Sequence, residues 1–158
     1  MHGSQVENDS EMAIVLQKCK KLARAIKASR VPSFTSMSIG KSIPSREVAD
    51  VLIDGYLRTF ETVYRVLHIP TFRADYERYW AKPQDAKTSF VVVMQLCMAI
   101  GACFYDEAYS LRVSATRWIY EALVWLMLPP DKSRMTIEGI QVCDLLNAYK
   151  AAKNAGDK

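Results

Sequence analysis

The sequence predicts an all-α protein: a single helical domain of about six helices. Long segments carry apolar residues at spacings of three and four, which is the period of an amphipathic helix. The 6 glycines and 6 prolines lie mostly between those segments, where turns are expected. Half of the 158 residues are hydrophobic and 24% are charged, which is a globular composition. A chain of this length buries roughly 70% of its unfolded surface, so it can form a core of its own.

Composition along the chain predicts five parts. We expect a disordered tail over residues 1–10, a basic amphipathic helix over 11–28, a linker over 29–44, a helical domain over 45–150 and a polar tail over 151–158. The linker is predicted from its five serines, two prolines and one glycine. Seven basic and three acidic side chains before residue 45 account for the net charge of +4, and the rest of the chain is neutral. A neutral body does not favour nucleic-acid binding across the whole surface.

The basic helix over 11–28 has an apolar stripe of about two heptads, formed by Met12, Val15, Leu16, Cys19, Leu22, Ala23 and Ile26. The cations occupy the other faces, and they make this segment a candidate interaction helix: Lys18, Lys20, Lys21, Arg24 and Lys27. Two heptads are marginal for dimerisation, so packing of the stripe on the chain's own domain is the favoured interpretation. The cations predict at most weak, salt-sensitive and sequence-independent DNA binding.

The first helix of the domain is predicted to run from Ser45, its N-cap, to His68. Its inner face is expected to consist of Val48, Val51, Leu52, Tyr56, Phe60, Val63 and Leu67. Its outer face carries charges of opposite sign four residues apart, namely Arg46 with Asp50, Asp54 with Arg58, and Glu61 with Arg65. Because each acid has its own arginine, these pairs indicate a solvated face and not an acid–base site.

His68 is the one chemically versatile side chain in a structured part of the sequence. Pro70 disfavours helical geometry at Ile69, so we expect the first helix to end near His68. Thr71 is the expected N-cap of the next helix, with Asp75 and Glu77 in or near its first turn. A base or metal ligand would need partners, yet the only other histidine is His2 in the polar tail. His68 is therefore interpreted as a structural residue at a helix C-terminus.

The segment 89–105 is almost wholly apolar and predicts a buried helix at the centre of the domain. It is shorter than the roughly 20 residues needed to span a bilayer, and it contains Gln95. The polar first ten residues do not resemble a signal peptide. No cysteine pair has metal-ligand spacing, so we expect free thiols in a reducing compartment and no metal site: Cys19, Cys97, Cys103 and Cys143.

Two further helices follow. The first is expected to bury Leu111, Ala115, Trp118, Ile119, Ala122, Trp125 and Leu126, with Arg112, Arg117 and Glu121 pointing away, and to end at Pro129-Pro130. Thr136 is expected to cap the last, whose inward residues would be Ile137, Ile140, Leu145 and Ala148. The tryptophans are interpreted as core, and a ligand pocket formed by Trp118, Trp125 and Tyr105 is the alternative. No G-x-S-x-G, P-loop or dinucleotide motif is present, so we expect no enzyme activity.

Three stretches resemble the fungal-specific transcription factor domain, which is the regulatory middle region of zinc binuclear cluster regulators. They begin SIPSREVADV, LCMAIGACFY and PPDKSRMTIE, and together they cover about residues 43–146. His68, Pro70, Thr71 and Phe72 match the family's His-x-Pro-Thr-Phe joint between two helices. Ala99, Ile100 and Gly101 match its buried Ala-Ile-Gly helix.

The resemblance implies an all-helical scaffold without catalytic residues, in a regulator of transcription that acts in the nucleus. It implies protein partners, among them the chain itself or a related full-length regulator. Family members read DNA through six zinc-binding cysteines, but only Cys19 precedes this domain, so we expect no cofactor in this chain. The abrupt polar ending predicts a truncation or a diverged gene end. The alternative function is a small-molecule-binding helical domain or an unrecognised enzyme.

Overall fold

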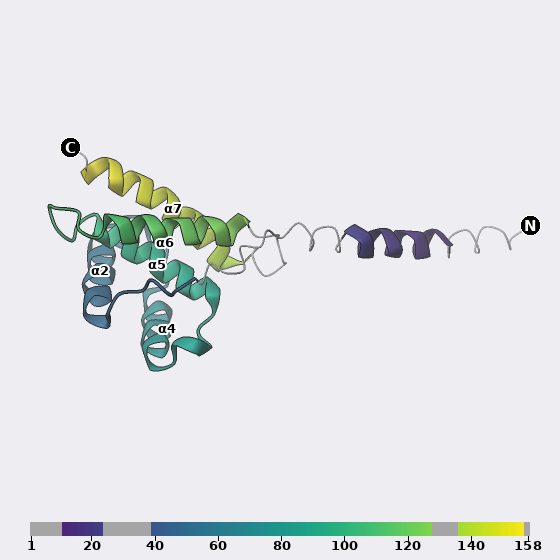
Figure 1. Cartoon of the computed structure of the whole chain (residues 1–158), viewed down its shortest axis with the longest axis horizontal. Coiled ribbons are helices and arrows are strands. Elements are labelled where there is room, and N and C mark those ends of the chain that lie inside the picture. The colour runs from purple at the N-terminus through teal and green to yellow at the C-terminus, as the bar shows by residue number, and fades with distance from the viewer. Residues whose placement is uncertain (1–10, 24–38, 128–135, 157–158) are drawn as a thin grey trace, which may run out of the picture. The chain divides into compact units, whose positions relative to one another are not determined.

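The computed structural model describes residues 11–23, 39–127 and 136–156 (Figure 1). Over these residues the protein is all-α, with helices, turns and no strand, as the sequence predicts. The chain divides into two units, Met1–Ser36 and Met37–Lys158. In the first unit, residues 11–23 form a helix on which Lys18, Lys20 and Lys21 are exposed. Arg24, Lys27, the predicted tail over 1–10 and most of the predicted linker lie outside the described residues. The polar tail predicted over 151–158 is helical as far as Gly156, where the last helix ends.

The second unit contains the predicted helical domain. Its elements, in chain order, are α2 (Arg46–Thr59), α3 (Glu61–Tyr64), α4 (Ile69–Ala81), the short 3₁₀ helix η2 (Pro83–Asp85), α5 (Thr88–Ala102), α6 (Arg112–Met127) and α7 (Ile137–Gly156). Thr136 caps α7, since its Oγ1 accepts a hydrogen bond from the Gly139 N–H at 3.4 Å.

Helix α5 is the centre of this unit, as its composition predicts. Every residue from Val91 to Ala102 is buried, and α2, α6 and α7 all pack against it. Figure 1 shows α5 behind α6, with α7 lying across them. A helix that is apolar all round must be enclosed by neighbours, which explains why three helices surround this one. Among the described residues, no helix is both long enough and apolar enough to cross a membrane.

Helices α2 and α5 cross in close backbone contact at Gly101. A Cβ built on Gly101 would lie 2.0 Å from the Leu52 carbonyl oxygen, so only glycine fits there. Gly55 faces Gly101 from the other helix, and its own Cβ would be 3.7 Å from the Gly101 Cα. The Ala-Ile-Gly sequence of α5 is therefore a packing feature, because the missing side chain lets two backbones touch.

The first predicted helix is shorter than expected. It is interrupted at Phe60, resumes as the single turn of α3, and ends where Arg65 adopts a left-handed conformation with φ of 50°. Thr59 donates its hydroxyl to the Gly55 carbonyl at 2.7 Å, a local bond that competes with helix continuation. Val63 was expected on the inner face but lies beyond this interruption, and it is 74% exposed. Val51 was also expected there and is 53% exposed, since the buried residues of α2 are Ala49, Leu52, Ile53 and Tyr56.

The outer charged face is only partly as predicted. Arg46 pairs with Asp50 at 3.8 Å and Arg58 with Asp54 at 2.6 Å, both among exposed side chains. The third pair is wrong, since Glu61 is buried and does not pair with Arg65.

Glu61 instead organises the bend after α2. It accepts hydrogen bonds from the Tyr56 hydroxyl at 2.5 Å and from the Leu67 N–H at 3.0 Å. Burial raises the pKa of the Tyr56 hydroxyl, and so do the nearby Cys97 and Glu61. A buried carboxylate with two donors is stable where an unpaired one would not be.

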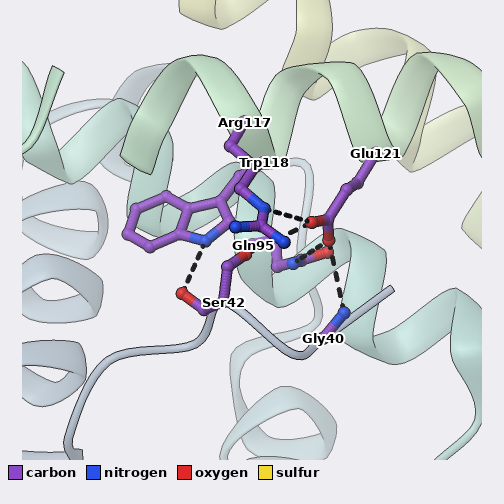
Figure 2. Close-up of polar contacts among 6 residues, drawn as sticks. All are labelled: Gly40, Ser42, Gln95, Arg117, Trp118 and Glu121. Atoms are coloured by element: carbon purple, nitrogen blue, oxygen red, sulfur yellow. Dashed lines mark hydrogen bonds and ion pairs between the residues drawn. The ribbon is translucent and has the colours of Figure 1, made fainter. Parts of the chain in front are cut away.

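Glu121 is the second carboxylate whose position the sequence mispredicted. It is 2% exposed on α6, although the helical pattern placed it away from the core. Its oxygens accept hydrogen bonds from Gln95 at 2.7 Å, and from the Gly40 N–H and the Ser42 hydroxyl at 3.3 Å each. Arg117 completes the cluster at 3.2 Å (Figure 2). These contacts hold the segment before α2 against α5 and α6.

The remaining helices bury the expected tryptophans but not all of the expected isoleucines. Trp118 is fully buried, and its Nε1 donates to the Ser42 carbonyl at 3.2 Å (Figure 2). On α7, Leu145 and Ala148 are buried as predicted. Ile137 and Ile140 are 75% and 64% exposed, so that part of the prediction is wrong. The inward face of α7 consists of Val142, Leu145, Leu146, Ala148 and Ala152, so it begins further along the helix than predicted.

Candidate functional site

The described part of the second unit contains a cavity of about 540 Å³. It lies between α4, the connection from Lys82 to Lys87, and the first turns of α5 and α7. It is lined by Leu67, His68, Thr71, Phe72, Asp75, Arg78, Tyr79, Lys82, Asp85, Ala86, Lys87, Ser89, Phe90, Val93, Thr136, Ile137, Glu138 and Gln141. Three of the four residues of the predicted joint therefore line its wall, and only Pro70 does not.

The joint itself is built differently from the prediction. His68 is not at a helix C-terminus: it has an extended backbone and is the N-cap of α4. Thr71 is not the N-cap but lies in the first turn, where its Oγ1 is 2.7 Å from His68 Nδ1. Pro70 also lies in that first turn, where its missing N–H and fixed φ are well tolerated. The first turn contains no acid, since α4 begins earlier than expected and places Asp75 and Glu77 further along.

The inner wall of the cavity is apolar and aromatic. Phe72 is 5% exposed, and its ring packs on Phe90 with centroids 5.7 Å apart. Leu67, Tyr79 and Val93 continue this surface and are all buried. Burial raises the pKa of the Tyr79 hydroxyl. The arrangement joins α4 to α5 through side chains from the joint and from the first turn of α5.

The rim of the cavity carries charges of both signs. Arg78 and Asp75 neutralise each other in an ion pair of 2.6 Å. Hydrogen bonds from its own backbone N–H and from the Thr136 side chain hold the pKa of Glu138 below its ordinary value, and Lys87 adds a smaller effect. Within the described residues, neither Lys82 nor Lys87 lies within 4.0 Å of a carboxylate.

Two sets of polar contacts hold the walls in place. Gln141 of α7 donates to the Val66 carbonyl at 2.9 Å, which ties α7 to the segment before the joint. On the other side of α4, Arg46 contacts both oxygens of Glu77 at 2.7 Å. The Tyr76 hydroxyl donates a hydrogen bond to Asp50 at 2.7 Å. The pKa of Tyr76 is raised, chiefly by burial and next by this hydrogen bond. Helix α4 is thus fastened to α2 by residues that the sequence indicated only as surface charges.

The structure agrees with the interpretation of the tryptophans as core and gives no support to the alternative, a small-molecule pocket around Trp118, Trp125 and Tyr105. Both tryptophans are core residues, 0% and 7% exposed, and none of the three lines the cavity. The signal that could have located the true cavity is the polar run KPQDAKTS between α4 and α5, which separates two apolar helices. In the described ranges no three metal-ligating side chains gather in one place.

Comparison with known proteins finds relatives of this chain among fungal transcription factors. It is 41% identical to the transcription factor opdR of Penicillium oxalicum over an alignment of 151 residues that covers 89% of this chain. It is 37% identical over 142 residues to the transcription factor lepE of Aspergillus flavus, covering 86% of the chain. The Zn(2)-C6 fungal-type transcription factor mpsB of Macrophomina phaseolina is 30% identical over 73 residues, covering 46% of this chain and 10% of mpsB.

The chain spans less than a fifth of these relatives, 18% of opdR and 17% of lepE. No protein-family model matches it, and no solved structure does. Over most of its length, this chain is related to one region of fungal transcription factors.

Proposed function

We propose that this chain is a helical regulatory segment of a fungal transcription factor, or a regulator derived from one, and that it acts in the nucleus through protein contacts and without catalysis. The observation that carries the proposal is the 41% identity to opdR over 89% of the chain, since identity at that level over a whole helical unit supports a shared role. The resemblance of the joint and the Ala-Ile-Gly helix to the regulatory middle region points the same way.

Exposed apolar side chains support a role in protein contacts. Val63, Val113, Met127 and Ile137 are each at least 74% exposed, although their side chains are as hydrophobic as those of the core. Single exposed apolar residues are ordinary, and we propose these four, on α3, α6 and α7, as the positions at which a partner would be contacted. We propose as partner a second copy of the chain or a related full-length regulator.

The proposal assigns DNA and zinc a minor place in this chain. The cations of the basic helix over 11–28 would supply only weak, sequence-independent DNA affinity. Zinc would belong to the cysteine cluster of full-length family members, and this chain would carry no cofactor of its own.

A segment exchange tests the proposed function. The 151-residue region of opdR that matches this chain would be replaced by the chain itself, and transcription of an opdR-dependent reporter would be measured. We expect regulated transcription to be retained. The control is the same exchange with Gly101→Val, which disrupts the α2–α5 crossing and should abolish it. Loss of regulation with the unaltered chain, at an equal protein level on an immunoblot, would contradict the proposal.

A further inference from the structure

We propose that the cavity beside α4 binds a small amphipathic carboxylate, with an aliphatic or aromatic body against its inner wall and its charged group at the rim. This goes beyond the proposed function, because ligand binding by the purified chain can be measured whether or not the chain regulates transcription. The proposal depends on the size of the cavity, on the two kinds of surface that line it, and on which of its charges are already paired.

Size and lining fit a drug-sized molecule. Ligand cavities typically enclose about 300–1,000 Å³ and are lined mainly by apolar and aromatic groups, with few polar ones. This cavity encloses about 540 Å³. Its inner wall includes Phe72, Phe90 and Val93, whose side chains offer rings and methyl groups to an apolar body. A wholly polar metabolite would leave that wall without a partner.

The pairing of the rim charges favours an acidic head group. Asp75 is neutralised by Arg78, and Glu138 accepts hydrogen bonds from its own turn of α7. Lys82 and Lys87 have no carboxylate within 4.0 Å in the described part of the chain, and Asp85 and Glu138 balance their two charges only from a greater distance. An anion placed between the two lysines therefore gains attraction without displacing an existing ion pair.

The start of α5 adds to this preference. Lys87 is the N-cap of α5, and no side chain caps the first turn. Ser89 and Phe90 of that turn line the cavity, so a carboxylate beside Lys87 lies near backbone N–H groups at the positive end of the helix dipole. Lys82 and Lys87 favour a ligand with a negative charge, and the N-terminus of α5 helps to bind its carboxylate.

Binding would connect α4 to the starts of α5 and α7, which already pack against each other. The cavity is lined by α4, α5 and α7, and α7 is otherwise tied to the joint region by Gln141. A ligand that binds only the folded chain raises the free energy of unfolding, so binding is visible as an increase in melting temperature. The expected change is a stabilisation without a change in helix content.

The test uses three probes that share one apolar body: decanoate, decanol and decylammonium. Each is titrated into the purified full chain, with affinity from calorimetry and melting temperature from circular dichroism. We expect decanoate to bind at least about tenfold more tightly than decylammonium, with decanol between them, because only the head group differs. Equal binding of all three would overturn the assignment of an anion, and no binding of any would overturn the cavity as a site.

Two variants locate the site. Ala86→Trp places an indole in the cavity from a partly buried position at the end of η2, and it should abolish binding of decanoate and decanol alike. The double change Lys82→Ala with Lys87→Ala should reduce decanoate affinity to that of decanol and leave decanol unaffected. The matched control is Lys41→Ala with Lys150→Ala, two exposed lysines that do not line the cavity.

Retained decanoate binding in Ala86→Trp would mean that the probe binds elsewhere, and it would overturn the proposal. If Ala86→Trp fails to fold, the methyl resonances of the unaltered chain show whether decanoate binds in this cavity or elsewhere. Decanoate should shift the Val93 and Ile137 methyl signals, and shifts confined to Leu145 and Val142 of the core would exclude this cavity.

Discussion

The Leu52 carbonyl oxygen lies where a side chain on Gly101 would begin, 2.0 Å from the position of its Cβ. We expect Gly101→Ala to lower the free energy of unfolding by about 3 kcal/mol or more, because the clash is with backbone and neither helix can yield separately. Denaturant unfolding followed by circular dichroism measures this.

The facing glycine supplies the control for that prediction. A Cβ on Gly55 would meet the Gly101 Cα at 3.7 Å, which is ordinary van der Waals contact. Gly55→Ala should therefore be neutral or stabilise the chain by up to about 1 kcal/mol, through the better helix propensity of alanine. Equal destabilisation by the two changes would show that α2 and α5 do not cross as closely as the structure has it.

Glu121 should matter much more to stability than its ion-pair partner Arg117. Glu121→Ala leaves Gln95, Ser42 and the Gly40 N–H without their acceptor, at an expected cost of about 3–5 kcal/mol. The Arg117 side chain is 60% exposed, so Arg117→Ala should cost less than about 1 kcal/mol. Thermal unfolding compares the two variants, and similar losses would mean that Glu121 acts only through the ion pair.

Buried tyrosines should make the fold sensitive to alkali. Burial raises the pKa of Tyr56, Tyr76 and Tyr79 above the ordinary value of about 10. The folded state thus holds these protons more tightly than the unfolded state, so their contribution to stability is complete below pH about 10 and is lost as pH rises further.

Tyrosinate absorbance against pH measures this effect. Three of the 8 tyrosines should ionise late, together with the loss of helical circular dichroism. Tyr76→Phe should remove one of the three and make the loss of stability above pH about 10 shallower. An unchanged alkaline profile in Tyr76→Phe would contradict the prediction.

The four cysteines should differ in reactivity. Cys97 is fully buried, and burial together with the charge of Glu61 raises the pKa of its thiol well above the ordinary range. Cys19 and Cys143 are exposed. Ellman's reagent should therefore modify Cys143 in the native chain and reach Cys97 only on unfolding, with peptide mass spectrometry assigning each site. The control Cys143→Ser should lose one rapidly reacting thiol, and native modification of Cys97 at the same rate would refute its burial.

Any DNA binding by this chain should depend on the cations of the basic helix over 11–28. Replacing Lys18, Lys20, Lys21, Arg24 and Lys27 by glutamine in the full chain should abolish retention on DNA at low salt and leave the melting temperature unchanged. Filter binding at several salt concentrations measures the effect. Undiminished affinity in the five-residue variant would place DNA contacts on the helical body.

Much of this architecture follows from sequence alone. The apolar run of α5 determined a central helix, since a helix without a polar face has to be enclosed. Glycine and proline positions separated most of the helices, and the core tryptophans of α6 followed from their helical spacing. The residues at the joint were also visible in the sequence, although the helix boundary was not. His68 begins α4 where it was expected to end the preceding helix.

The tertiary structure decided what helical periodicity leaves open. Periodicity identifies a face but not the neighbour that covers it, so it could not distinguish Glu61 and Glu121 from the solvated acids beside them. It also could not show that Ile137 and Ile140 would remain exposed. Their places depend on donors from distant segments: Leu67 N–H for Glu61, and Gly40 and Gln95 for Glu121. The cavity arises in the same way, because the starts of α4, α5 and α7 come together only when all three helices pack on one core.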